Sequence, residues 1–298
     1  MPRDPEPAAT GHAVAPSLLV QLRGLRPSLS PAEDRVAERV LGDPRGTAGL
    51  TITELAVAAG TSETTVLRFC KRLGLPGYPQ LRLALAEAGT QPRTQAAPTS
   101  DISADDSIDD VIAKVAYADA SAVEETAETI DRGALSTAAR AIAGAGRVDV
   151  YGIGASALVG KDLQQKLHRI GSMVFCWNDP HVALTSATLL GPGDVAIGIS
   201  HSGTTTETVE ALALARGKGA TTVAITNFPL SRLARDADLV LATAARESSL
   251  RSGATASRIA ALTVVDCLYI AVAQLDLDRA RTAVEDTRRA VAGHHVRH

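Results

Sequence analysis

The sequence has few aromatic residues, few cysteines and no strong excess of charge of either sign. Of its 298 residues 3% are aromatic, three are cysteine, and the formal net charge is -3. This balance gives no general attraction to nucleic acid or membrane, so either function would need a local patch. Cys70, Cys176 and Cys267 lie far apart without metal-ligand spacing, which indicates reduced, packed thiols in a cytoplasmic protein. We therefore predict no metal site and no cofactor.

Long apolar runs are absent as well. No window of about 18 uninterrupted apolar residues exists, so no membrane-spanning helix is predicted. Residues 1–7 lack the apolar core of a secretory signal, and the Pro- and Ala-rich residues 1–16 predict a disordered tail. The whole chain is 45% hydrophobic and 21% charged, which is an ordinary globular composition, and it is long enough for two domains.

Helix signals follow one another in a first predicted domain, residues 17–90. Its helices are expected over residues 31–41, 52–59 and 63–73. Each is preceded by a capping residue: Ser30, then Thr51 or Thr53, then Ser62. The last two are short and are joined through Ala-Gly-Thr-Ser at residues 59–62, which predicts a helix-turn-helix in an all-helical domain.

The third of these helices divides into an apolar face and a basic face. Val66, Phe69, Cys70 and Leu73 follow the i, i+3, i+4, i+7 spacing of one apolar stripe. The opposite side and the cap supply the predicted DNA-binding residues, which are Ser62, Thr64, Thr65, Arg68, Lys71 and Arg72. Residues 17–95 hold ten Arg and Lys against seven Asp and Glu, a local net charge of +3 in an acidic protein. An ordinary solvated face would also be polar, but the cap, the turn and the divided faces together favour a recognition helix for the major groove of double-stranded DNA.

A linker and a second domain come next. Residues 91–104 are the predicted linker, because residues 91–100 offer no apolar anchor. The second domain spans residues 105–292, where strands alternate with helices. The strands are expected over residues 147–151, 172–177, 194–199, 221–226 and 239–242. This order predicts a doubly wound five-stranded parallel sheet with ligands at the carboxyl ends of its strands, so the chain is α plus α/β.

Two hydroxyl-rich loops follow strands that this fold would place side by side. Gly154-Ala-Ser156 follows the first strand, and Ser200-His-Ser-Gly-Thr-Thr205 follows the third. A turn of this kind at a helix N-terminus offers N–H and O–H donors and the positive end of the helix dipole, which suit a phosphate. One loop alone could be an N-cap with spare serines, but two predict a site for one phosphate with sugar hydroxyls nearby. The predicted phosphosugar-binding residues are Gly154, Ser156, Ser200, His201, Ser202, Gly203 and Thr205.

Two other interpretations of these loops are weaker. Gly152-x-Gly154-x-Ser156 is part of a dinucleotide-binding fingerprint, but Gly160 comes too late for its third glycine and no acidic residue ends the second strand in the usual place. His201 suggests catalysis, but its side chain can also point away from the ligand between two serines that bind it. NAD binding and a catalytic histidine are therefore not favoured.

The same residues resemble a known family. Residues 199–207 and 151–156 are similar to the phosphosugar loops of the SIS (sugar isomerase) domain, and residues 29–33, 62–74 and 77–82 are similar to the N-terminal domain of RpiR-type transcriptional regulators. The resemblance implies a bacterial regulator of sugar-phosphate or amino-sugar metabolism, a homodimer or homotetramer that binds operator DNA. It also implies that an SIS-like domain senses a phosphorylated sugar or amino sugar, whose phosphate Ser156, Ser200, Ser202 and Thr205 would hold.

An aldose–ketose isomerase is the alternative, because SIS domains also catalyse that reaction. Such chemistry needs a placed base, usually a carboxylate, near the phosphate. Residues 247–261 would supply it, but they contain one acid, Glu247, ahead of the helix, and Ser257 and Arg258 stand within it. This shortage and the predicted recognition helix favour a regulator, so we predict no catalytic residue. A third possibility, an SIS module acting only as an assembly scaffold, leaves the donor loops unexplained.

Overall fold

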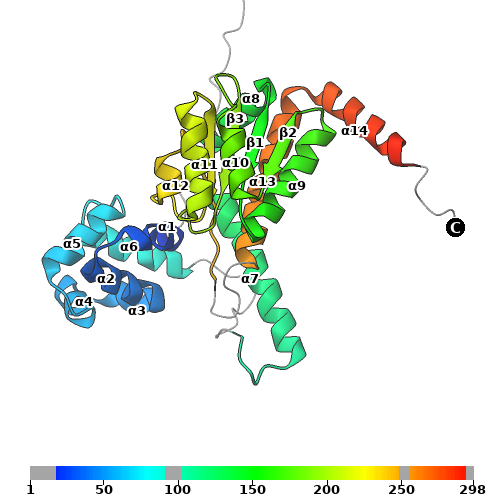
Figure 1. The fold of residues 1–298 in the computed structure, drawn as a ribbon. Helices are drawn as coiled ribbons and strands as arrows, with labels where there is room; N and C mark the ends of the chain where they lie inside the picture. Colours follow the sequence, from blue (N-terminus) through cyan, green and yellow to red (C-terminus); the bar gives the residue numbers. More distant parts are fainter. Residues whose placement is uncertain (1–17, 91–101, 248–254, 293–298) are drawn as a thin grey trace, which may run out of the picture.

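The computed structural model describes residues 18–90, 102–247 and 255–292. The predicted tail, residues 1–16, and most of the predicted linker, residues 91–104, lie outside these ranges. The described chain forms a small helical unit, followed by a larger α/β unit (Figure 1).

The helical unit packs short capped helices around one apolar core. Its elements are α1 (Leu18–Leu25), the 3-10 turn η1 (Arg26–Ser28), α2 (Pro31–Gly42), α3 (Pro44–Gly49), α4 (Ile52–Ala58), α5 (Glu63–Arg72) and α6 (Tyr78–Thr90). Ser30 and Thr51 each form a capping box, so Thr51 rather than Thr53 starts α4. The predicted stripe of α5 is buried in this core beside Leu22 and Leu81, as expected.

Helix α3 is absent from the sequence prediction. The sequence analysis expects no helix between residues 41 and 52, yet Asp43 ends α2 and at once caps α3 by accepting the N–H of Gly46 at 2.8 Å. Pro44 then occupies the first turn, where its missing N–H costs nothing. One Gly-Asp-Pro sequence therefore joins two helices without a loop.

The α/β unit contains the predicted five-stranded parallel sheet. Its helices are α7 (Ile108–Thr129), α8 (Arg132–Gly144), α9 (Ala155–Arg169), α10 (Pro180–Ala187), α11 (Thr206–Gly217), α12 (Arg232–Arg235), α13 (Ala256–Leu275) and α14 (Leu277–Val291). Its strands are β1 (Val148–Tyr151), β2 (Val174–Trp177), β3 (Val195–Ile199), β4 (Thr221–Thr226) and β5 (Leu239–Ala242), in the order β2-β1-β3-β4-β5. Every pairing is parallel, which confirms the expected fold class and the adjacency of β1 and β3.

Helices cover both faces of the sheet (Figure 1). On one face α8, α9 and α13 contribute Ile142, Leu163 and Val264 to the larger core. On the other face α10, α11 and α12 contribute Ala187, Leu212 and Leu233. By length and composition alone α13 could cross a membrane, but half of that window is buried inside the protein, so its apolar composition is accounted for by packing.

A buried polar cluster lies on strand β1. Asp149 is fully buried and accepts hydrogen bonds from Arg147 Nε at 2.8 Å, Trp177 Nε1 at 2.9 Å and Ser186 Oγ at 2.5 Å. The guanidinium of Arg147 also stacks on Phe175, 4.9 Å from the ring centroid. A buried carboxylate is tolerated when several donors hydrogen-bond to it. Because these donors come from Trp177 of β2 and Ser186 of α10, the cluster links both elements to β1.

The helical unit rests against the α/β unit through α1. Arg23 Nη1 lies 2.7 Å from Glu125 Oε2 on α7, and the backbone at Gly24 lies against Pro229. A cavity of about 500 Å³ separates the two units beside this contact; its lining includes Val20, Leu25, Leu73, Pro229 and Ala244. Its walls come from both units, so the two share a largely apolar boundary.

Candidate functional site

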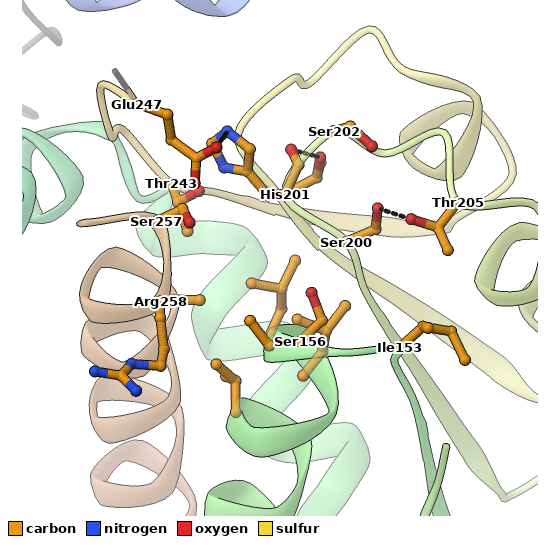
Figure 2. Close-up of a pocket in the computed structure, with 16 residues that line it drawn as sticks. Ile153, Ser156, Ser200, His201, Ser202, Thr205, Thr243, Glu247, Ser257 and Arg258 are labelled. Atoms are coloured by element: carbon orange, nitrogen blue, oxygen red, sulfur yellow. Dashed lines mark hydrogen bonds and ion pairs between the residues drawn. The ribbon is translucent and has the colours of Figure 1, made fainter. Parts of the chain in front are cut away.

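Both predicted donor loops open into one pocket. The pocket has a volume of about 280 Å³ and lies where the carboxyl ends of β1, β3 and β4 meet (Figure 2). Ser156 enters it from the first turn of α9, directly after the loop that follows β1, and Ser200, Ser202 and Thr205 enter it from the loop after β3. The other lining residues are Ile153, Ala155, Val159, Ile199, His201, Ile225, Thr226, Thr243, Glu247, Ser257, Arg258 and Ala261.

Internal hydrogen bonds shape the loop after β3. The Ser200 and Thr205 hydroxyl oxygens are 2.9 Å apart, and the Gly203 N–H donates to Ser200 Oγ at 3.1 Å. Ser202 Oγ accepts from the N–H of Thr204 at 3.3 Å and from its hydroxyl at 2.9 Å. A hydroxyl that accepts within the loop still has its own proton to donate, so Ser202 can donate to an anion.

Three helices begin at this pocket without a capping side chain. They are α9, α11 and α13, whose N-cap residues Gly154, Thr205 and Thr255 make no side-chain cap hydrogen bond. In contrast, α2–α5, α7, α8, α10, α12 and α14 each begin with a side chain that accepts a backbone N–H. At α9 the N–H groups of Ser156 and Ala157 donate to the carbonyl oxygens of Ile153 and Gly154, so this helix contributes mainly the positive end of its dipole. The N-terminal ends of these helices and the hydroxyl groups of the two loops together favour an anion as the ligand of this pocket.

Gly154 and Gly203 shape the loops and do not line the pocket. Both have left-handed φ angles, +60° and +63°. At Gly203 an added Cβ would lie 2.4 Å from Ser231 Cβ, so glycine is required both by the backbone and by the space. At Gly154 nothing lies within 4 Å of such a Cβ, so only the backbone requires it.

His201 lies in the pocket wall opposite Glu247. Its Nε2 is 3.8 Å from Glu247 Oε2, and its ring meets the edge of Phe228 at 5.6 Å between centroids. Burial lowers the pKa of His201, and the carboxylate of Glu247 opposes this only in part. The imidazole is therefore mainly neutral at neutral pH and lies beside a carboxylate.

In the wall opposite the two loops, the sequence analysis considered only residues 247–261, as the segment that would supply an isomerase base near the phosphate, and gave them no ligand-binding role. Thr226 ends β4, Thr243 directly follows β5, and Ser257 and Arg258 open α13. A polar residue at the carboxyl end of a parallel strand was the available signal for the two threonines. Ser257 and Arg258 were named in the sequence analysis only as residues that stand where a base would be needed, and both line the pocket.

Helix α5 presents its basic side chains outward. Arg68, Lys71 and Arg72 border a surface hollow together with Ser30 and Glu33. The Arg68 side chain is 60% exposed, with its Nε 3.8 Å from the nearly buried Glu33. A hydrogen bond from the Ser30 hydroxyl is the main cause that lowers the pKa of Glu33, so an anion lies behind Arg68 and orients it.

Thr65 is the exception among the predicted DNA-binding residues. Ser62, Thr64, Arg68, Lys71 and Arg72 are exposed, as expected. Thr65 is 7% exposed, and its hydroxyl oxygen lies 3.1 Å from that of the cap, Ser62. The prediction that Thr65 shares the outer face was wrong, because the first turn of α5 packs toward the core.

Comparison with known proteins agrees with both units. Residues 17–92 match the helix-turn-helix domain of the rpiR family, and residues 141–271 match the SIS domain. An HTH-type transcriptional regulator of Caldanaerobacter subterraneus is 38% identical over 257 residues, covering 86% of this chain and 90% of the relative. A second HTH-type regulator, YbbH of Bacillus subtilis, is 31% identical and covers 92% and 96%.

Solved structures give the same picture. NanR of Vibrio vulnificus, complexed with ManNAc-6P, is 31% identical with a TM-score of 0.60 and covers 94% of this chain and all of that one. The sugar isomerase domain of an RpiR transcription factor from Sphaerobacter thermophilus is 29% identical with a TM-score of 0.55 over 60% of this chain. A helix-turn-helix unit joined to an anion-binding α/β unit defines a ligand-responsive transcriptional regulator. The chain belongs to the RpiR family of HTH-type transcriptional regulators that carry an SIS domain.

Proposed function

We propose that this regulator senses a phosphorylated sugar or amino sugar and controls genes of sugar or amino-sugar metabolism. The observation that carries the proposal is the convergence of two hydroxyl loops and the N-terminal ends of α9 and α11 on one pocket. Ser156, Ser200, Ser202 and Thr205 bind the phosphate, with Gly154 and Gly203 shaping the loops. His201 contacts the sugar. The N-acetylmannosamine phosphate named with NanR supports this class of ligand.

We further propose the assignment of the remaining parts. Residues 17–90 are the DNA-binding domain, residues 91–104 the linker and residues 105–292 the sensor domain. Ser62, Thr64, Arg68, Lys71 and Arg72 contact operator DNA. The protein acts in the cytoplasm as a homodimer or homotetramer, since paired recognition helices read half-sites about one helical turn apart.

Regulation follows from linkage between the two sites. A ligand changes DNA affinity only if it binds the DNA-bound and free forms with different affinity, typically by about 1–3 kcal/mol. A phosphosugar in the pocket shifts the placement of the paired helical units and therefore the spacing of the recognition helices.

A panel of phosphorylated sugars in a thermal-shift assay tests the ligand class, with inorganic phosphate as a control. A ligand that binds the folded state raises its melting temperature. Ser202→Ala should remove the shift and leave operator affinity nearly unchanged, whereas Ser172→Ala, outside the pocket, should keep both. If Ser202→Ala stops binding operator DNA, the separation of the two roles is wrong.

An aldose–ketose isomerase remains a second candidate because Glu247 lines the pocket. Its carboxylate lies beside a histidine and could serve as the base that the reaction needs. Incubating the protein with an aldose or ketose phosphate and following interconversion by NMR separates the two functions. A regulator without this activity leaves the substrate unchanged, and turnover that Glu247→Gln removes would establish the enzyme.

A further inference from the structure

The segment 243–247 separates the sensor pocket from the cavity between the two units. It follows β5, and the ligand-facing wall includes Thr243 and Glu247. Thr243, Ala244 and Ala245 also line the other cavity, which borders α1 and the end of α5. The segment therefore lies between the space for the ligand and the boundary of the DNA-binding unit, and Thr243 lines both cavities.

The first part of this segment is held firmly. The Ala244 N–H donates to the buried Thr126 Oγ1 at 3.0 Å, and the Ala245 N–H donates to the buried Asn227 Oδ1 at 2.7 Å. The last two residues are held through their side chains. Arg246 Nη2 donates to Glu125 Oε1 at 2.8 Å, and Glu247 faces His201 in the pocket (Figure 2). The backbone of Ala244 and Ala245 is therefore anchored to the α/β unit, whereas Arg246 and Glu247 are held by side-chain contacts.

Glu125 is shared between the two units. Its Oε1 accepts from Arg246, and its Oε2 accepts from Arg23 of α1 at 2.7 Å. Its side chain is 15% exposed and that of Arg23 20%, so solvent screens this pair less than the outer one with Arg246, which is 51% exposed. Arg23 and Arg246 both bind the carboxylate of Glu125, and their positive charges repel each other. Removing Arg246 therefore strengthens the net attraction between Glu125 and Arg23.

We propose that Glu125 is the positioning residue that transmits occupancy of the sensor pocket to the DNA-binding unit. A sugar hydroxyl that donates to Glu247 draws residues 246–247 toward the pocket and withdraws Arg246 from Glu125. The carboxylate then binds Arg23 alone, and α1 docks more tightly on α7. The ligand-dependent step rests on the proposed function, whereas the competition at Glu125 does not.

Hydrogen exchange of α1, residues 18–25, tests the competition without any ligand, because exchange reports how often a segment opens. Arg246→Ala should slow exchange in α1 by about threefold, the size expected for one partly exposed ion pair. Placed in a Glu125→Gln background, the same substitution should have no effect. Unchanged exchange in Arg246→Ala, or an equal effect in both backgrounds, would overturn the proposal.

N-acetylmannosamine 6-phosphate tests the ligand step. In the wild type it should raise the melting temperature and slow exchange in α1; in Glu125→Gln it should raise the melting temperature alone. Glu124→Gln is the matched control: its residue is exposed, has no ion pair within the described chain, and should leave both responses intact. Binding without a change in α1 refutes transmission through Glu125. If the ligand does not bind at all, the result counts against the proposed ligand. The hydrogen-exchange experiment on Arg246→Ala without ligand then decides whether Arg23 and Arg246 compete for Glu125.

Discussion

Replacing Gly203 by alanine should damage the protein more than the same change at Gly193. Both glycines have positive φ angles, +63° and +91°. They differ in the space around a new Cβ. At Gly203 this atom would lie 2.0 Å from Ser231 Oγ and 2.4 Å from Ser231 Cβ, whereas at Gly193 nothing lies within 4 Å.

The magnitude follows from two separate costs. A left-handed backbone costs an L-residue about 1–2 kcal/mol, and both variants share this cost. Overpacking adds about 1–3 kcal/mol at Gly203 alone, because Ser231 caps α12 and cannot simply rotate away. For a domain of this size each kcal/mol lowers the melting temperature by roughly 2–4 °C. The Gly203 variant should therefore melt several degrees below the Gly193 variant.

Urea unfolding and the phosphosugar thermal-shift assay measure both consequences. Relief of the clash moves the loop that carries Ser200, Ser202 and Thr205, so Gly203→Ala should also lose the ligand-dependent shift. Gly193→Ala lies in a turn outside the pocket and should retain it. Equal stability of the two variants, or a Gly203→Ala protein with normal ligand response, would refute the assigned role of this glycine.

Three further predictions concern other parts of the molecule. Arg68→Ala should weaken operator binding about tenfold in a fluorescence anisotropy titration and leave the phosphosugar response unchanged; equal losses of both would contradict it. Asp149→Asn removes the negative charge that Arg147 and its neighbours surround. Because the guanidinium of Arg147 then lacks its partner, the free energy of unfolding measured in urea should fall by about 3 kcal/mol. A loss near zero would show that Arg147 is solvated. Burial lowers the pKa of His201 below its usual 6.5, so the unfolded chain takes up the proton first as the pH falls. The resulting stability is present above pH 6.5 and is lost as the pH falls through the folded-state pKa. In His201→Gln the free energy of unfolding should therefore depend less on pH between about pH 7.5 and about pH 5. Identical stability-versus-pH curves for the variant and the wild type would contradict the lowered pKa.

Much of the fold could be predicted because its signals are local. The strands of a parallel sheet are buried on both faces and therefore appear as short apolar runs, as at Val195–Ile199. The recognition helix has a cap and an apolar stripe within a dozen residues. Helix α3 was missed because Asp43 and Pro44 both terminate one helix and start another, which one sequence pattern cannot distinguish.

The candidate site was only half accessible from the sequence. The loops after β1 and β3 carry their own chemistry, and strand order brings them together. The opposite wall comes from residues distant in the chain: Thr243 directly follows β5, and Arg258 reaches the pocket because α13 returns to the sheet. The side of α5 that holds Thr65 was assigned wrongly because a helical wheel does not show which neighbouring helix covers the first turn.

The donor loops of the sensor pocket contain hydroxyl groups and backbone amides but no lysine or arginine within residues 152–156 and 200–206. The proposed phosphate contacts are therefore neutral groups, whereas the proposed DNA contacts, Arg68, Lys71 and Arg72, would release counterions from the duplex. A rise in ionic strength should for this reason weaken operator binding more steeply than phosphosugar binding.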